Sequence, residues 1–213
     1  MLSLNKGEHK ELVYINEPNL DLSISQAEDS VLRIVVIDYP HSTPSRHALD
    51  SRHIIEIHHA GTNCQTEIYA LAYVSNKDCV HTCTRVKHDI GGGTSKQIIK
   101  FVLDDQAQGS FQGELKILPD AQKVSAFQTN RNLLLSQQAT MRTQPQLEIY
   151  ADDVKASHGA TTGQLDESAL FYMQQRGIDP ATGRKMLINA FMQDIIDQIS
   201  DETLREQVRQ QLE

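Results

Sequence analysis

Most of the chain consists of short stretches in which apolar and polar residues alternate. Alternation with a period of two places one set of side chains on each face of a strand, so residues of about 10–155 predict a long array of short strands. The run Val31–Ile37 is apolar apart from Arg33, as expected of a strand that is largely buried on both faces. A sandwich, a barrel and a β-helix all produce this pattern, so periodicity alone leaves the architecture open.

The apolar period becomes helical after Leu165. Asp166 can cap a short helix that ends at Gly177, and Asp179 followed by proline can start a second helix. Over residues 181–199 the apolar arc is wider than a helix resting on one surface needs. It fits either a second contact with another protein or a helix enclosed within its own domain. Ser200 can cap a last helix, so we divide the chain into a β core (1–165) and a helical region (166–213).

Composition and charge exclude several classes of protein. The 213 residues carry a formal net charge of −8, which gives no general electrostatic attraction to nucleic acid. No apolar run approaches the ~20 residues that cross a bilayer, and we expect no membrane association. Three cysteines are too few for a disulfide framework, so reduced thiols in the cytoplasm are the simplest interpretation.

Thiols and imidazoles form one candidate metal site. Cys79, His81 and Cys83 would share one face of a strand, and these side chains suit iron or zinc. The spacing is not that of a zinc finger. A stand-alone metal-binding module is therefore one alternative, and small thiols that merely fill strand positions are the other.

Paired carboxylates offer a different alternative. Asp104-Asp105 and Asp152-Asp153 could serve a β-helix enzyme that acts on polysaccharide, where acids protonate the substrate or bind metal. Neighbours along a strand point to opposite faces, and most such pairs are turn residues. The run Gly91-Gly92-Gly93 lacks the spacing of a phosphate-binding loop and fits a turn.

A single histidine, His158, lies among small residues in the loop where strands give way to helices. Another chain could reach its imidazole there. Its other interpretation is a structural histidine that bonds a backbone carbonyl.

This segment resembles a known signature. Residues 147–155, Ser157-His158-Gly159-Ala160-Thr161, Gly163-Gln164, 170–172 and 176–178 are similar to the SufB/SufD family, the scaffold subunits of SUF iron–sulfur cluster assembly. Residues 130–136 and 145–147 add an upstream match, and the resemblance covers about residues 111–192. His158-Gly159-Ala160-Thr161 followed by Gly163-Gln164 is the SufD form, whereas SufB members usually carry glutamate after the histidine. Many SufD members have cysteine at the position of Ala156, so any role for a thiol there is lost or moved.

The resemblance implies a mainly β fold, a right-handed parallel β-helix with a C-terminal α-helical segment. It implies a cytoplasmic scaffold without enzymatic activity that pairs with a SufB-like subunit, or with itself when isolated, through β-helix ends. A histidine matching His158 would lie at that interface beside a transient iron–sulfur cluster or iron. We expect no tightly bound cofactor on the isolated chain. Family members often carry a helical N-terminal domain, for which this chain has no room, so we expect a core fragment.

The same resemblance implies that the C-terminal helical region docks a SufC-like ATPase. We place that contact at four residues of the two longer helical stretches: Tyr172, Arg176, Leu187 and Phe191.

Overall fold

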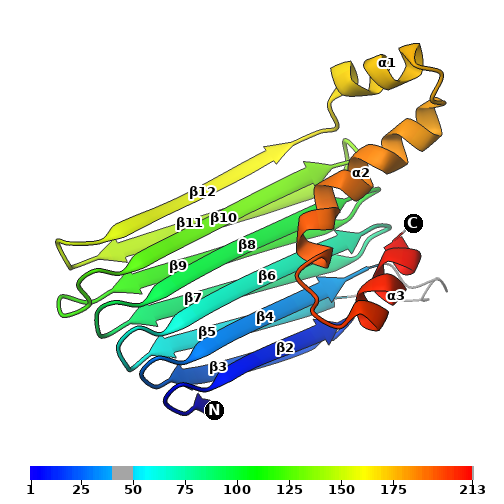
Figure 1. The fold of residues 1–213 in the computed structure, drawn as a ribbon. Coiled ribbons are helices and arrows are strands. Elements are labelled where there is room, and N and C mark those ends of the chain that lie inside the picture. Colours follow the sequence, from blue (N-terminus) through cyan, green and yellow to red (C-terminus); the bar gives the residue numbers. More distant parts are fainter. Residues whose placement is uncertain (40–49, 213) are drawn as a thin grey trace.

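The alternating stretches form a parallel solenoid in the computed structural model, which describes residues 1–39 and 50–212 (Figure 1). Each strand pairs in parallel with the strand two elements along the chain, so consecutive strands lie in opposite sheets. Within the described residues each sheet has six strands. The predicted right-handed parallel β-helix with C-terminal helices is confirmed.

The two sheets are named A and B. Sheet A contains, in spatial order, β1 (Leu2–Leu4), β3 (Asn19–Gln26), β5 (Asp50–His59), β7 (Cys79–His88), β9 (Gln108–Ile117) and β11 (Thr140–Ile149). Sheet B contains β2 (His9–Ile15), β4 (Val31–Asp38), β6 (Gln65–Val74), β8 (Thr94–Leu103), β10 (Ser125–Leu134) and β12 (Lys155–Gly163).

The main core lies between the two sheets. Each coil supplies one inward side chain at each register position, so apolar residues stack into columns such as Ile57, Val86 and Leu115. All three are almost fully buried. Burying an aliphatic side chain of this size stabilises a fold by about 1.5–3 kcal/mol, so a stack of aliphatic columns can hold together a chain that is poor in aromatic residues.

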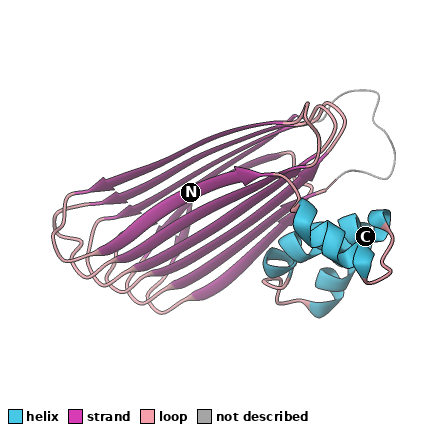
Figure 2. Cartoon of the chain, turned by 90° about the horizontal axis from the view of Figure 1, so that it is seen from above, coloured by secondary structure: helices cyan, strands magenta, loops and turns pink. Residues whose placement is uncertain are grey.

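Three helices follow the last strand: α1 (Glu167–Gln175), α2 (Pro180–Ile196) and α3 (Glu202–Leu212). They gather at one end of the strands, where α2 and α3 cover part of the outer face of sheet B (Figure 2). Val35 and Ile37 point outward into this second core, whereas Ile34 points inward. Residues 34–37 are therefore buried on both faces, as predicted, whereas Arg33 is half-exposed on the outer face and pairs with Glu67. None of the three helices described is long and apolar enough to cross a membrane.

A buried lysine fastens α2 to sheet B. The Lys100 Nζ donates hydrogen bonds of 2.6 Å to the Phe191 carbonyl oxygen and 2.6 Å to Asp194 Oδ1. The same ammonium lies 4.7 Å from the centroid of the Phe191 ring. The Lys100 side chain is only 4% exposed, so these contacts replace water around a buried charge.

The helix boundaries follow mostly from their caps. Asp166 and Asp179 accept hydrogen bonds from the first turns of α1 and α2, and Gly177 has a φ of 85° after α1, as predicted. The predicted cap of α3 is wrong by one residue. Asp201 Oδ1 accepts from the Leu204 N–H, whereas the Ser200 hydroxyl donates to Glu11 Oε1.

Candidate functional site

His158 lies in the middle of β12, the last strand of sheet B, and not in a loop as the sequence suggested. It pairs in register with Gln128, whose side chain is buried between the sheets. Because in-register residues of parallel strands point to the same side, His158 also points inward. No further coil covers it among the described residues, and the imidazole is exposed. Neither of its ring nitrogens has a hydrogen-bond partner in the described chain.

The surroundings of His158 are uncharged. The inward side chains of the last coil form a surface that we call the terminal opening, and they are mostly half-buried on β11 and exposed on β12. Its members are Met141, Thr143, Pro145, Leu147, Ala156, His158, Ala160 and Thr162. The outer edges of β11 and β12 also lack a paired strand in the described residues. Unpaired edges of this kind invite another chain, so the terminal opening is a candidate interface.

The thiol–imidazole candidate is placed on the outer face of sheet A. Cys79, His81 and Cys83 share that face, as predicted. His81 is held by Ser110, with 2.7 Å between Nδ1 and Oγ, and lies 3.5 Å from Asp50 Oδ1. Burial raises the pKa of both thiols, which disfavours the thiolate that binds metal. In the described chain no three His, Cys, Asp or Glu side chains are grouped so as to hold a metal ion.

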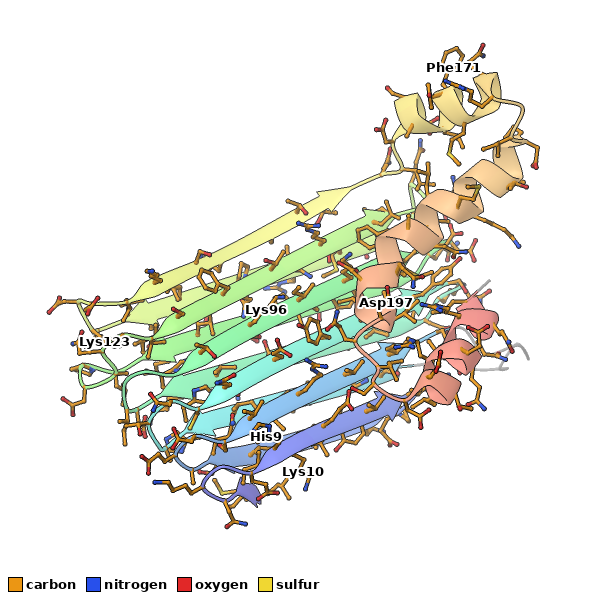
Figure 3. The ribbon with its side chains drawn as sticks, viewed as in Figure 1. His9, Lys10, Lys96, Lys123, Phe171 and Asp197 are labelled. Atoms are coloured by element: carbon orange, nitrogen blue, oxygen red, sulfur yellow. The ribbon has the colours of Figure 1, made fainter. Side chains whose placement is uncertain are left out.

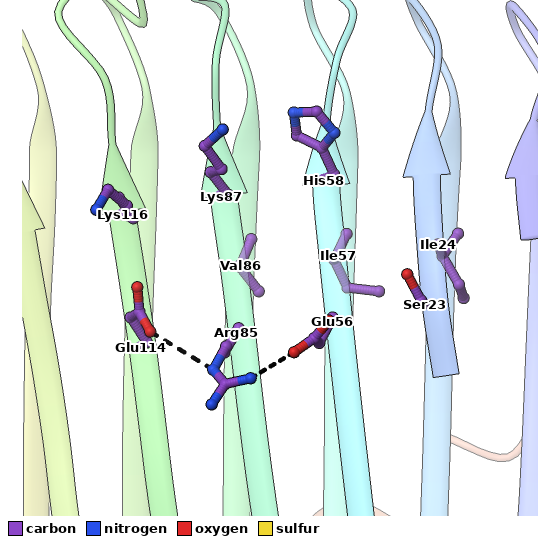
Figure 4. A pocket seen from close by; sticks show the side chains of 10 residues that line it. All are labelled: Ser23, Ile24, Glu56, Ile57, His58, Arg85, Val86, Lys87, Glu114 and Lys116. Atoms are coloured by element: carbon purple, nitrogen blue, oxygen red, sulfur yellow. Dashed lines mark hydrogen bonds and ion pairs between the residues drawn. The ribbon is translucent and has the colours of Figure 1, made fainter. Parts of the chain in front are cut away.

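Two hollows lie side by side on this outer face, of about 580 Å³ beside Cys83 and about 220 Å³ beside Lys87. In the smaller hollow, Arg85 lies between two carboxylates, Glu56 and Glu114, and makes an ion pair with each (Figure 4). The neighbouring Lys116 pairs with Glu148. These charges neutralise one another across the strands, so the smaller hollow presents no unpaired carboxylate for acid catalysis.

Neither carboxylate pair lines these hollows, and the two pairs lie at opposite ends of the strands. Asp104 and Asp105 follow β8, at the carboxyl ends of the sheet B strands, whereas Asp152 and Asp153 precede β12 at the opposite end (Figure 1). They therefore line no common groove. Asp105 has a φ of 49°, a turn conformation, which agrees with the interpretation of these pairs as turn residues.

The glycine run 91–93 makes the turn between β7 and β8. A Cβ at Gly93 would lie 3.0 Å from His59 Nδ1 and 3.1 Å from His88 Nδ1, so glycine leaves room for these imidazoles. The rings of His59 and His88 meet edge to face, 4.2 Å apart, and both side chains are fully buried. Each Nε2 bonds a hydroxyl, of Thr66 and Ser95 respectively. The glycines thus serve packing and not phosphate binding.

This histidine pair makes the fold sensitive to acid. Burial lowers the pKa of His88 to about 4, and burial together with the neighbouring histidines lowers the pKa of His59 well below its usual value. Between about pH 6.5 and 4 the unfolded chain binds protons that the folded chain does not, so stability falls as the pH falls through this window. Burial of Asp38 raises its pKa to about 7 and acts in the opposite direction.

We therefore expect His88→Gln, which keeps a donor for Ser95, to flatten the acid side of the stability curve. The free energy of unfolding of the wild type minus that of the variant should decrease by up to about 3 kcal/mol between pH 6.5 and 4, at about 1.4 kcal/mol per pKa unit. Urea unfolding across this range measures the difference, in which the Asp38 contribution cancels. A difference that is constant with pH would contradict the assignment.

The expected docking residues fall into two groups. Tyr172 on α1 and Arg176 at the C-cap of this helix are exposed, and the Arg176 Nη2 donates a 2.9 Å hydrogen bond to the Tyr172 hydroxyl. Leu187 and Phe191 are half-buried on α2, with Phe191 against Lys100 and the second core. Most of the apolar arc of α2 is therefore enclosed by its own chain.

The sequence analysis missed Phe171, which is 62% exposed beside Tyr172 at 60%. Phe171 lies at the tip of the molecule, far from the sheets (Figure 3). No residue of α1 is buried. Two adjacent aromatic residues on a short helix with few other apolar positions were the available signal.

Comparison with known proteins identifies the family. Residues 23–191 match the family model described as "SUF system FeS cluster assembly, SufBD core domain". The chain belongs to the SufB/SufD family. It is SufD-like within this SufBD family: it is 38% identical over 148 residues to the iron–sulfur cluster assembly protein SufD of Escherichia coli. That alignment covers 70% of this chain and 35% of the relative.

Two further SufBD relatives extend the comparison. The iron–sulfur cluster assembly SufBD family protein slr0076 of Synechocystis is 36% identical, over 75% of this chain and 35% of its own length. Protein ABCI7 of the Arabidopsis thaliana chloroplast is 35% identical, over 74% of this chain and 34% of its own length. The chain thus spans about a third of the length of these relatives. Its membership places it in SUF iron–sulfur cluster assembly.

Proposed function

We propose that the chain is the β-helix core of a SUF scaffold subunit that pairs with a SufB-like subunit through the terminal opening. His158 would supply one ligand to iron or a nascent cluster held between the two subunits. The observation that carries this proposal is the placement of His158: an unpartnered imidazole, pointing inward on the last strand of an open solenoid. A second chain that docks there would complete the surroundings of that side chain.

The ligand chemistry supports an interfacial and transient site. Imidazole nitrogen is a suitable iron ligand, but one nitrogen cannot hold a cluster alone. The other inward residues of the terminal opening offer no thiolate or carboxylate, and Ala156 replaces a possible thiol. The remaining ligands therefore come from the partner, and the isolated chain binds no cluster tightly.

The helices support the second partnership. The exposed aromatic pair of α1 and the adjacent Arg176 form a protruding surface suited to a SufC-like ATPase. Nucleotide hydrolysis takes place in that subunit, so this chain acts as a cytoplasmic scaffold and not as an enzyme. The terminal opening can also pair two copies of the isolated chain.

A single substitution separates pairing from folding. Ala160 points into the terminal opening and is exposed, so Ala160→Arg places a cation in the uncharged surface that the partner would cover. We expect loss of co-elution with a SufB-like subunit in size-exclusion chromatography and an unchanged melting temperature. Desolvating an unpaired charge at an interface is strongly unfavourable.

Ser157→Arg is the matched control, because Ser157 is exposed on the same strand but points to the outer face. It should leave pairing intact. Equal pairing by both variants would show that the terminal opening is not the interface.

A further inference from the structure

A column of buried amides runs through the solenoid and ends at His158. Gln97 and Gln128 occupy successive coils at the same register position, and His158 occupies the next. The Gln97 Oε1 accepts hydrogen bonds from the Thr84 hydroxyl, at 2.6 Å, and from the Gln128 Nε2, at 3.3 Å. Both glutamine side chains are almost completely buried. Polar residues in an otherwise aliphatic core carry a cost unless their hydrogen bonds are satisfied.

Two atoms of this column lack a partner among the described residues: the Gln97 Nε2 and, on the side chain next to His158, the Gln128 Oε1. The Gln128 side chain is only 2% exposed, and its Oε1 accepts no hydrogen bond from a described residue. An unsatisfied buried acceptor destabilises a fold, so such an atom requires an explanation.

The opposite sheet is shaped to accommodate Gln128. A Cβ at Gly113 of β9 would lie 2.3 Å from the Gln128 Nε2 and 2.6 Å from its Cδ. Only glycine at this position leaves space for the amide. The Gln128 amide therefore occupies a space between the sheets that Gly113 leaves open, and its strand is the neighbour of the strand that carries His158.

Register brings the two unpartnered groups together. Gln128 and His158 are direct partners on adjacent parallel strands, and both point inward. Adjacent strands lie about 4.8 Å apart, so a ring N–H of His158 can reach the Gln128 Oε1 by side-chain rotation alone. Histidines that bind metal usually donate their second ring N–H to such an acceptor, which fixes the tautomer and the direction of the ring.

We propose that Gln128 is a positioning residue for His158, accepting a hydrogen bond from one imidazole N–H so that the other nitrogen presents its lone pair to the terminal opening. This inference rests on the proposed function for the role of that lone pair. The hydrogen bond itself joins two residues of this chain, so it can be measured without a partner or iron.

The test is the tautomer of His158 in the isolated chain, read from the two ring-nitrogen shifts of ¹⁵N-histidine-labelled protein above pH 7. We expect one tautomer to predominate in the wild type. In Gln128→Met, which keeps the length of the side chain but removes the acceptor, the ratio of tautomers should change by about fivefold, the effect of one ordinary hydrogen bond. Asn130→Leu is the control: it removes a buried amide at the next inward position of β10, which pairs with Ala160 and not with His158.

The outcomes separate this inference from the proposed function. An even tautomer mixture in the wild type overturns the inference, even if Gln128→Met fails to fold. An equal shift in Asn130→Leu also overturns it, because the effect would then be a general loosening. If the tautomer depends on Gln128 but His158→Ala builds clusters normally, the positioning contact stands and the proposed function fails.

Discussion

His158→Ala should assemble with its partners as the wild type does and accumulate almost no cluster. The imidazole is exposed, so its removal should lower the free energy of unfolding by no more than about 1 kcal/mol, the value of the hydrogen bond proposed with Gln128. Loss of a direct ligand should lower the cluster yield by more than about tenfold, since even outer hydrogen-bond partners of metal ligands matter on that scale. Visible absorbance and iron content per reconstituted complex measure the yield.

The matched control for this variant is Ser157→Ala, the preceding residue on β12, which points to the opposite face. It should keep the wild-type yield. Normal cluster accumulation on an intact His158→Ala complex would remove the role assigned to the imidazole.

Replacing Phe171 and Tyr172 together with alanine should strongly weaken docking of the ATPase subunit. Both rings are more than half exposed and α1 buries no residue, so the melting temperature should not change. Aromatic residues at the centre of an interface commonly contribute 2 kcal/mol or more, so we expect affinity to fall by about 30-fold or more. Titration calorimetry with a SufC-like subunit measures the loss.

The control for this prediction is Phe127→Ala, because Phe127 is an exposed aromatic residue on β10 of sheet B, outside the helices. It should bind as the wild type does. Truncating α2 would be a poorer test: Ile188, Met192, Ile195 and Ile196 pack on sheet B, and their loss would expose its apolar outer face. Unchanged binding by the double variant would move the docking surface away from α1.

The strands that the alternation pattern predicted are those with apolar inner faces. Strand β10 lacked the signal because Gln128, Asn130 and Asn132 point inward and satisfy most of their hydrogen bonds inside the core. Strand β12 lacked this signal because most of its inward side chains are small and are exposed at the end of the solenoid. A pattern based on hydrophobicity cannot detect strands whose inner residues are amides or belong to an uncovered coil.

Local chemistry allowed the helix ends to be predicted, whereas long-range packing could not be. Asp179, Pro180 and Gly177 act within one turn of their own positions, and each does what the sequence indicated. Lys100 lies on strand β8 but is buried against α2, far along the chain, and no local pattern indicates that contact. The wide apolar arc of α2 likewise required the structure, because the second surface that covers it is mostly the chain's own.

The strand that carries His158 is an edge strand joined by a short segment to the protruding helix α1. Strand β12 leads into α1 through residues 164–166, and in the described chain it is paired on one side only, with β10. If the contacts of α2 do not carry a force applied to α1, only the hydrogen bonds between β12 and β10 resist it. An inner strand would be held by two such sets of hydrogen bonds. A partner that binds α1 and moves it would therefore act directly on the strand that carries the imidazole.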